Sequence, residues 1–132
     1  MRLFSALTIL CLSTTAAGAQ TPMSPAEFEA YATGRTLTYA EGGVIYGIEE
    51  YLPNRRVRWA FVNDECREGY WYEQDNDVCF VYENNPVPQC WSFSRGDNGL
   101  IARFLNADDG REIYEAQQSD EPLRCLGPDV GV

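Results

Sequence analysis

The stretch that decides the fold is VCFVYENNPVPQCWSFSR, residues 78–95, in which two alternating runs flank a polar loop with two prolines. In the first run, Phe80 and Tyr82 occupy one face of an extended chain and Cys79 occupies the other. In the second run the aromatic residues again share one face, and Cys90 lies on the opposite face. The pattern predicts two antiparallel strands whose aromatic faces form part of a core.

The same period of two continues on both sides of this hairpin, interrupted by short turn sequences rich in Gly, Asn and Asp. It predicts about eight strands with short connections, which favour antiparallel neighbours in sequence order. We therefore predict a mainly β protein, an up-and-down meander that forms a small lipocalin-like barrel or curved sheet, with a two-sheet sandwich as the alternative. The predicted strands are Thr36–Ala40, Val44–Leu52, Arg56–Val62, Gly69–Gln74, Val78–Glu83, Gln89–Arg95, Leu100–Leu105 and Arg111–Ala116.

One helix is predicted before the strands, in residues 21–33. Ser24 is a suitable N-cap, and Glu27 three residues later completes a capping box. Gly34 is a natural C-terminal stop. We expect this helix to lie against the sheet or to plug one end of it.

The N-terminus has the three parts of a secretory signal: one positive charge at Arg2, a short apolar run and an Ala17-Gly18-Ala19 site. We predict that residues 1–19 are a signal peptide and that residues 20–132 form a single domain. Cys11 lies within the signal, and the residues before it do not form a lipidation motif. No later apolar stretch approaches membrane-spanning length, so we expect a periplasmic or secreted protein without a membrane anchor.

Four cysteines remain after removal of the signal, which in a small exported domain predicts two disulfides. If the aromatic residues of the hairpin face the core, Cys79 and Cys90 face outward on consecutive strands. This placement predicts a Cys79–Cys90 bridge and, by elimination, a Cys66–Cys125 bridge.

The composition excludes several chemistries. The chain contains no His, which removes the usual general base and zinc ligand. All ten basic residues are Arg, so lysine-based catalysis is absent as well. Without Arg2 the formal charge is about −11, which repels nucleic acid. Such a charge is compatible with a basic partner protein, but in most proteins it serves solubility alone. We assign no catalytic residue, cofactor or metal site, and we expect a monomer.

Two clusters are candidate binding residues. The run Tyr70-Trp71-Tyr72 places rings on both faces of a strand, so at least one ring is expected at the surface. Arg56 and Arg58, with Arg55, form a cationic group suited to a carboxylate or phosphate. The competing interpretation is cross-strand pairing with Glu49 or Glu50. These two acids face opposite sides of their strand and therefore cannot form a catalytic pair.

The hairpin region, CREGYWYEQDNDVCFVYENNPVPQCWSF in residues 66–93, resembles a group of uncharacterised small secreted or periplasmic proteobacterial β-proteins. These share a G-x-W, C-F-x-Y, C-W-x-F pattern. The resemblance implies the fold and the disulfide and transfers no catalytic residues. Small periplasmic lysozyme inhibitors are similar in architecture only.

The sequence thus favours a non-enzymatic exported binding module, and inhibition of a basic partner protein is one role that it could have. The first alternative is a lipocalin-like carrier of a small apolar or sugar ligand, which requires a hollow barrel. The second is a hydrolase that uses carboxylates, which requires converging acids with raised pKa values.

Overall fold

The computed structural model describes residues 20–125 of the chain. The predicted signal peptide, including Cys11, lies outside these residues. No helix within residues 20–125 is long and apolar enough to cross a lipid bilayer.

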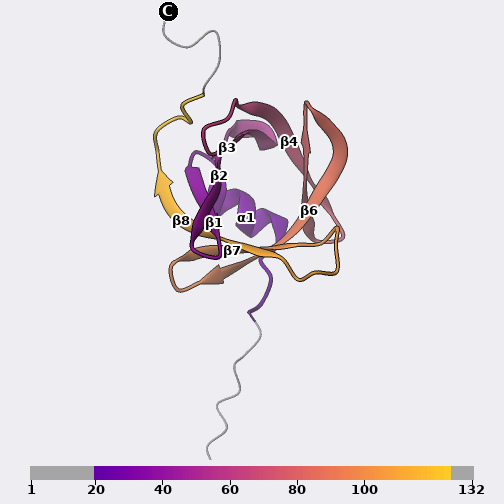
Figure 1. Cartoon of the computed structure of the whole chain (residues 1–132). Helices are drawn as coiled ribbons and strands as arrows, with labels where there is room; N and C mark the ends of the chain where they lie inside the picture. The colour runs from indigo at the N-terminus through magenta and orange to yellow at the C-terminus, as the bar shows by residue number, and fades with distance from the viewer. Residues whose placement is uncertain (1–19, 126–132) are drawn as a thin grey trace, which may run out of the picture.

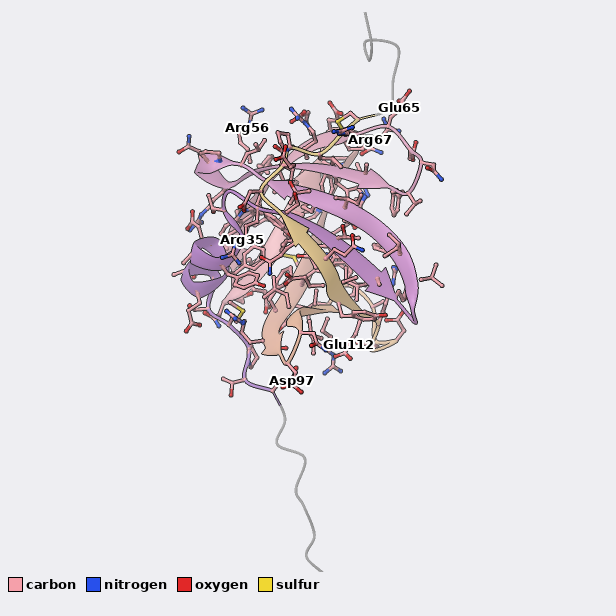
Figure 2. The ribbon with its side chains drawn as sticks, turned by 90° about the vertical axis from the view of Figure 1, so that its left-hand side faces the viewer. Arg35, Arg56, Glu65, Arg67, Asp97 and Glu112 are labelled. Atoms are coloured by element: carbon pink, nitrogen blue, oxygen red, sulfur yellow. A yellow bond between two sulfur atoms is a disulfide. The ribbon has the colours of Figure 1, made fainter. Side chains whose placement is uncertain are left out.

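Eight antiparallel strands form a closed barrel in sequence order, with β8 hydrogen-bonded to β1 (Figure 1). The predicted meander and its closure are therefore confirmed, and the two-sheet sandwich is not formed. Charged side chains such as Arg35, Arg56 and Arg67 lie on the outside (Figure 2). The strands are β1 Thr36–Glu41, β2 Val44–Tyr51, β3 Arg56–Phe61, β4 Arg67–Gln74, β5 Asp77–Tyr82, β6 Asn85–Gly96, β7 Gly99–Phe104 and β8 Glu112–Ser119.

The helix α1, Pro25–Ala32, closes one end of the barrel. The predicted capping box is present, because the Ser24 hydroxyl accepts from the Glu27 N–H and the Glu27 carboxylate accepts from the Ser24 N–H. Residues 21–23 were predicted to be helical but are extended, and the Met23 N–H bonds to the carbonyl of Phe93. This short segment ties the start of the helix to β6.

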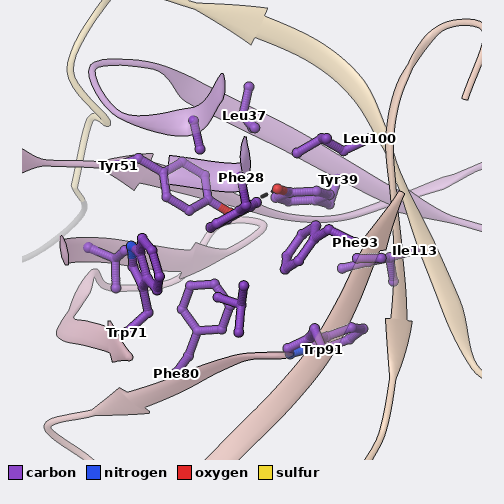
Figure 3. Close-up of a cluster of buried hydrophobic side chains, with 14 of the residues drawn as sticks. Phe28, Leu37, Tyr39, Tyr51, Trp71, Phe80, Trp91, Phe93, Leu100 and Ile113 are labelled. Atoms are coloured by element: carbon purple, nitrogen blue, oxygen red, sulfur yellow. Dashed lines mark hydrogen bonds between the residues drawn. The ribbon is translucent and has the colours of Figure 1, made fainter. Parts of the chain in front are cut away.

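Phe28 of α1 is the centre of the aromatic core (Figure 3). Its side chain is fully buried and packs against rings from four strands, which are Tyr51, Trp71, Phe80 and Phe93. Rings this close stabilise one another beyond the burial of their apolar area. The helix therefore acts as a plug whose apolar face completes the barrel interior.

The sixth strand is longer than predicted. Residues 84–88 were predicted to be a loop because Pro86 and Pro88 cannot donate to a strand ladder. The strand instead begins at Asn85, and its register against β5 shifts between Phe80 and Tyr82. Both prolines fall in this irregular segment, where their missing N–H groups interrupt no regular pairing.

Both predicted disulfides are present. Cys79 and Cys90 face each other across β5 and β6, and Cys66 is bonded to Cys125. Val78 and Phe80 on either side of Cys79 belong to the core, so the alternation places Cys79 on the outer face. Cys79 is nevertheless fully buried.

The C-terminal segment 120–125 forms a strap across the outside of the first strands. The Thr36 hydroxyl of β1 donates to the carbonyl of Glu121, and the Leu123 N–H donates to the Glu50 carboxylate of β2. Leu123 is buried although it lies outside the barrel. The Cys66–Cys125 bridge then fastens the strap to the segment before β4.

Candidate functional site

A cavity of about 260 Å³ opens at the end of the barrel opposite α1. Its rim is formed where β3 and β5 end and where β4 and β6 begin, and its floor is the aromatic core. Volumes of about 300–1000 Å³ are usual for small-molecule sites, so this cavity suits a compact ligand. The lining residues are Tyr39, Tyr46, Glu49, Tyr51, Trp59, Phe61, Asp64, Arg67, Phe80, Tyr82, Asn84, Asn85, Gln89, Trp91 and Ile113.

Two local features of β2 shape the wall of the cavity. The pairing of β1 with β2 skips Tyr46, which is therefore a bulge residue. Its ring lies in the cavity wall, and the centroids of the Tyr46 and Trp59 rings are 5.6 Å apart. A Cβ atom at Gly47 would lie 2.3 Å from the Trp59 ring, so only glycine leaves room for this indole. The bulge and the glycine together line one side of the cavity with rings.

The most unusual polar group in the cavity is the carboxyl of Glu49, which is 1% exposed. Its hydrogen-bond partner is the Tyr82 hydroxyl, which lies 3.0 and 3.1 Å from the two carboxyl oxygens. Burial raises the pKa of Glu49 well above its ordinary value, and the hydrogen bond from Tyr82 opposes this shift without cancelling it. Burial in the barrel therefore favours the protonated form of Glu49 relative to an exposed glutamate.

A second polar pair lies deeper, where the hydroxyls of Tyr39 and Tyr51 are 2.8 Å apart (Figure 3). Burial raises the pKa values of Tyr39, Tyr51 and Tyr82 well above 10. These phenols therefore remain neutral at physiological pH and keep their hydrogen-bonding protons.

The other buried acids have structural partners. The Glu115 carboxylate accepts from the Tyr31 hydroxyl at 2.8 Å and the Leu100 N–H at 2.9 Å, which joins α1 to β7 and β8. The Glu50 carboxylate accepts from the Leu123 N–H and pairs with Arg58 at 3.4 Å. Glu49 has neither a backbone N–H nor an arginine among its hydrogen-bond and ion-pair partners in residues 20–125.

The three aromatic candidates of β4 lie in different environments. Trp71 is 3% exposed and packs on Phe28 in the core, so it contributes nothing to a surface patch. Tyr70 is 52% exposed and lies 6.4 Å from the ring of Tyr72 on the outer face. The expectation that at least one ring of the run is exposed is confirmed, but none of the three residues lines the cavity.

The arginine candidates form ion pairs on the outside of the barrel. Arg58 bonds Glu68 at 2.7 Å and Glu50 at 3.4 Å, and Arg56 lies 3.8 Å from Glu68. Arg55 pairs with Glu29 of α1 and stacks over the ring of Trp71. The predicted cross-strand pairing with Glu50 is therefore present, and these cations are occupied by acids of the same chain.

Sequence reasoning missed Glu49 as a candidate site residue because it was considered only as half of a catalytic pair with Glu50 or as a cross-strand partner of the arginines. The signal was available, since alternation with the inward-facing Tyr51 places Glu49 inside the barrel. The cavity contains one interior carboxyl, Glu49, and one acid at the rim, Asp64. In the described part of the chain no cluster of His, Cys, Asp or Glu is suited to a metal ion.

The buried acid predicts a specific pH dependence of stability. The folded protein holds the Glu49 proton more tightly than the unfolded chain does. The contribution of this group to the free energy of unfolding is therefore fully present below about pH 4.5, and it decreases as the pH rises toward the raised pKa. We expect Glu49→Gln to remove this contribution, so that the variant gains stability relative to the wild type between pH 4.5 and 8. Thermal unfolding of both proteins across this range measures the difference. A constant difference would show that Glu49 is already ionised in the folded protein.

Comparisons of the chain with protein-family models, with curated proteins and with solved structures gave no match.

Proposed function

We propose that this protein is an exported, non-enzymatic binding module that holds a small organic ligand in the open end of its barrel. The observation that supports this proposal is the cavity of about 260 Å³ that the core side chains leave unfilled. Its walls carry aromatic rings together with a few polar groups, which is the usual composition of a small-molecule site. The proposal therefore follows the carrier alternative rather than the protein-inhibitor hypothesis.

The surroundings of the cavity mouth support an apolar component in the ligand. The exposed ring of Phe61 at the rim continues the aromatic wall, 5.4 Å from Trp59 and 5.5 Å from Tyr46. Further exposed apolar side chains belong to strand ends and loops at this same end of the barrel. They are Val44, Ile45, Val62, Val87 and Leu105. An apolar molecule would meet favourable contacts before and during its passage into the barrel.

The proposal places the protein outside the cytoplasm, in the periplasm or the surrounding medium. Two disulfides join all four cysteines of the described residues, and such bridges persist in oxidising compartments. The signal-like segment at residues 1–19 supports the same location.

Filling the cavity tests the proposal. Gln89 lines the cavity and pairs with the inward-facing Phe80, so Gln89→Trp adds an indole inside the barrel. A panel of small neutral, cationic and anionic aromatic compounds is first screened against the wild-type protein by ligand-observed NMR. We expect at least one compound to bind and Gln89→Trp to weaken its binding at least about tenfold, because the added ring occupies the ligand volume.

The matched control is Tyr70→Trp, which places an indole on the outer face of β4, where the native ring is already exposed. Ligand binding should be unchanged in this variant. If no compound in the panel binds, or if Gln89→Trp and Tyr70→Trp bind equally well, the barrel is not a ligand site and the proposal fails.

A further inference from the structure

We propose that the ligand is a small organic ammonium cation with an apolar body, and that the carboxyl of Glu49 is its counter-ion inside the barrel. This inference rests on the proposed function, because it names the class of molecule that the cavity accepts. It is drawn from the partners of Glu49, the rings around it and the distribution of charge at the cavity mouth.

The first support is the incomplete set of partners around Glu49. An ionised carboxylate accepts about four hydrogen bonds, and here one phenol, that of Tyr82, donates to it. A buried acid with such poor compensation is costly to the fold unless a positive group completes the site. Glu50 and Glu115, the other buried acids, are completed by groups of the chain itself. Glu49 instead belongs to the lining of the cavity, with the Tyr82 hydroxyl as its hydrogen-bond partner within the described residues.

The second support is the aromatic wall. Trp59 lies directly opposite Glu49 in the β2–β3 register, and Tyr46 packs against its ring. Trp91 and Phe80 complete the surrounding surface of the cavity. Ring faces attract cations by their quadrupole, and a group of rings beside a carboxylate is suited to a substituted ammonium. Such a ligand keeps its apolar part against the rings and its charge near Glu49.

The third support is the absence of a competing cation in the cavity lining of the described residues. Arg67 is the only basic residue in that lining, and it lies at the rim, where it pairs with Glu65 at 3.4 Å. Asp64 adds a negative charge at the same rim. The formal net charge of −10 draws cations toward the protein and repels anions. An anionic ligand would meet Glu49 without any free positive group to hold it.

Binding of a cation is linked to the ionisation of Glu49. The titratable groups that face it are the phenols of Tyr39 on β1, Tyr51 on β2 and Tyr82 on β5. These phenols remain neutral well above physiological pH, so none of them releases a proton in the range in which the probes are compared. A permanently charged ligand displaces the Glu49 proton into solvent, and its affinity rises with pH until the raised pKa of Glu49 is passed.

Two probes of nearly equal shape test the inference. Phenyltrimethylammonium carries a permanent positive charge, and tert-butylbenzene is its neutral carbon counterpart. Both are titrated into the full mature protein at pH 5 and pH 8, and binding is followed by isothermal titration calorimetry and by tryptophan fluorescence. We expect the cation to bind at least about tenfold more tightly than the neutral probe at pH 8 and to lose affinity at pH 5.

Glu49→Gln keeps the shape of the side chain and removes its charge, so it should lower the affinity for the cation at least about tenfold and leave the neutral probe unaffected. The matched control is Glu50→Gln, which makes the same charge change on the opposite face of the same strand and should retain cation binding. Equal binding of the two probes, or undiminished cation binding by Glu49→Gln, overturns the inference. If both probes fail while another compound of the panel binds in the cavity, the cation inference falls and the binding function stands. Failure of the whole panel removes both.

Discussion

Replacing Phe28 with alanine is expected to lower the free energy of unfolding by about 3–5 kcal/mol, the usual cost of truncating a buried phenylalanine. The ring is fully buried and sits where α1 meets the barrel. It packs on Phe93 at 4.2 Å, on Trp71 at 5.4 Å and on Tyr51 at 5.5 Å. Because these neighbours belong to different strands, they cannot all collapse into the vacated volume. The loss is a large share of the about 5–15 kcal/mol that stabilises a typical domain.

Urea denaturation followed by far-ultraviolet circular dichroism measures this loss. Phe61→Ala is the matched control, because it makes the same truncation at the cavity rim, where the ring is 48% exposed. That variant should lose less than about 1 kcal/mol. The free energy of unfolding of Phe28→Leu should lie between those of the wild type and Phe28→Ala. Equal losses from Phe28→Ala and Phe61→Ala would show that α1 is not an integral part of the core.

Removal of the Cys66–Cys125 bridge by a double substitution with serine is expected to destabilise the protein by about 4 kcal/mol. The two cysteines are 59 positions apart, so the bridge restricts more than half of the described chain in the unfolded state. The bridge also holds the strap, whose contacts with Thr36 and Glu50 weaken when its end is free.

The second bridge supplies the matched comparison. Cys79 and Cys90 are 11 positions apart, so their removal should cost less, about 3 kcal/mol. Denaturation of both double variants under the same conditions shows which bridge contributes more to the free energy of unfolding. Proteolysis should also release residues near Cys125 first in the Cys66→Ser, Cys125→Ser variant. A larger loss from the shorter loop would contradict the explanation by chain entropy.

The sequence predicted most of the fold because its local signals agree with one another. Turn residues separate the strands at nearly every junction, the Ser24 and Glu27 capping box begins the helix, and Gly34 ends it. The alternation around Cys79 and Cys90 predicted their bridge, and the Cys66–Cys125 bridge followed by elimination. These features depend on neighbours in the chain, which a single sequence displays directly.

The features that escaped prediction depend on contacts between distant segments. Pro86 and Pro88 indicate a loop in isolation, and the register shift of β6 that accommodates them exists only in the paired sheet. Tyr46 turns into the cavity because of a bulge against β1, which no local pattern specifies. The buried position of Trp71 follows from its packing on Phe28 of α1. Tertiary context decided each of these positions.

In the candidate site, too, local patterns were predictable from the sequence and contacts between distant segments were not. Alternation alone placed Glu49 and Glu50 on opposite faces, and the structure agrees, with Glu49 inside the barrel and Glu50 bonded to the strap. Whether an inward acid meets a hollow or a filled interior depends on how fifteen lining residues pack, and that depends on the closed barrel. The sequence predicted pairing of the arginines with Glu49 or Glu50, and the structure confirms the pair with Glu50, whereas the partners Glu29 and Glu68 come from α1 and β4 and were not predicted.

The nested arrangement of the two bridges has a consequence for how the chain matures. The native pairs join the first cysteine of the described chain to the last and the second to the third, so neither Cys66 nor Cys125 bonds to its nearest neighbour. If the chain is exported with its N-terminus first and is oxidised during export, Cys66 and Cys79 reach the oxidising compartment well before Cys125 does. The hairpin of β5 and β6 must therefore capture Cys79 before Cys66 is oxidised, or a later thiol–disulfide exchange must correct the pairing. By either route, the strap is fastened only after Cys125 has been exported and Cys66 is available to it.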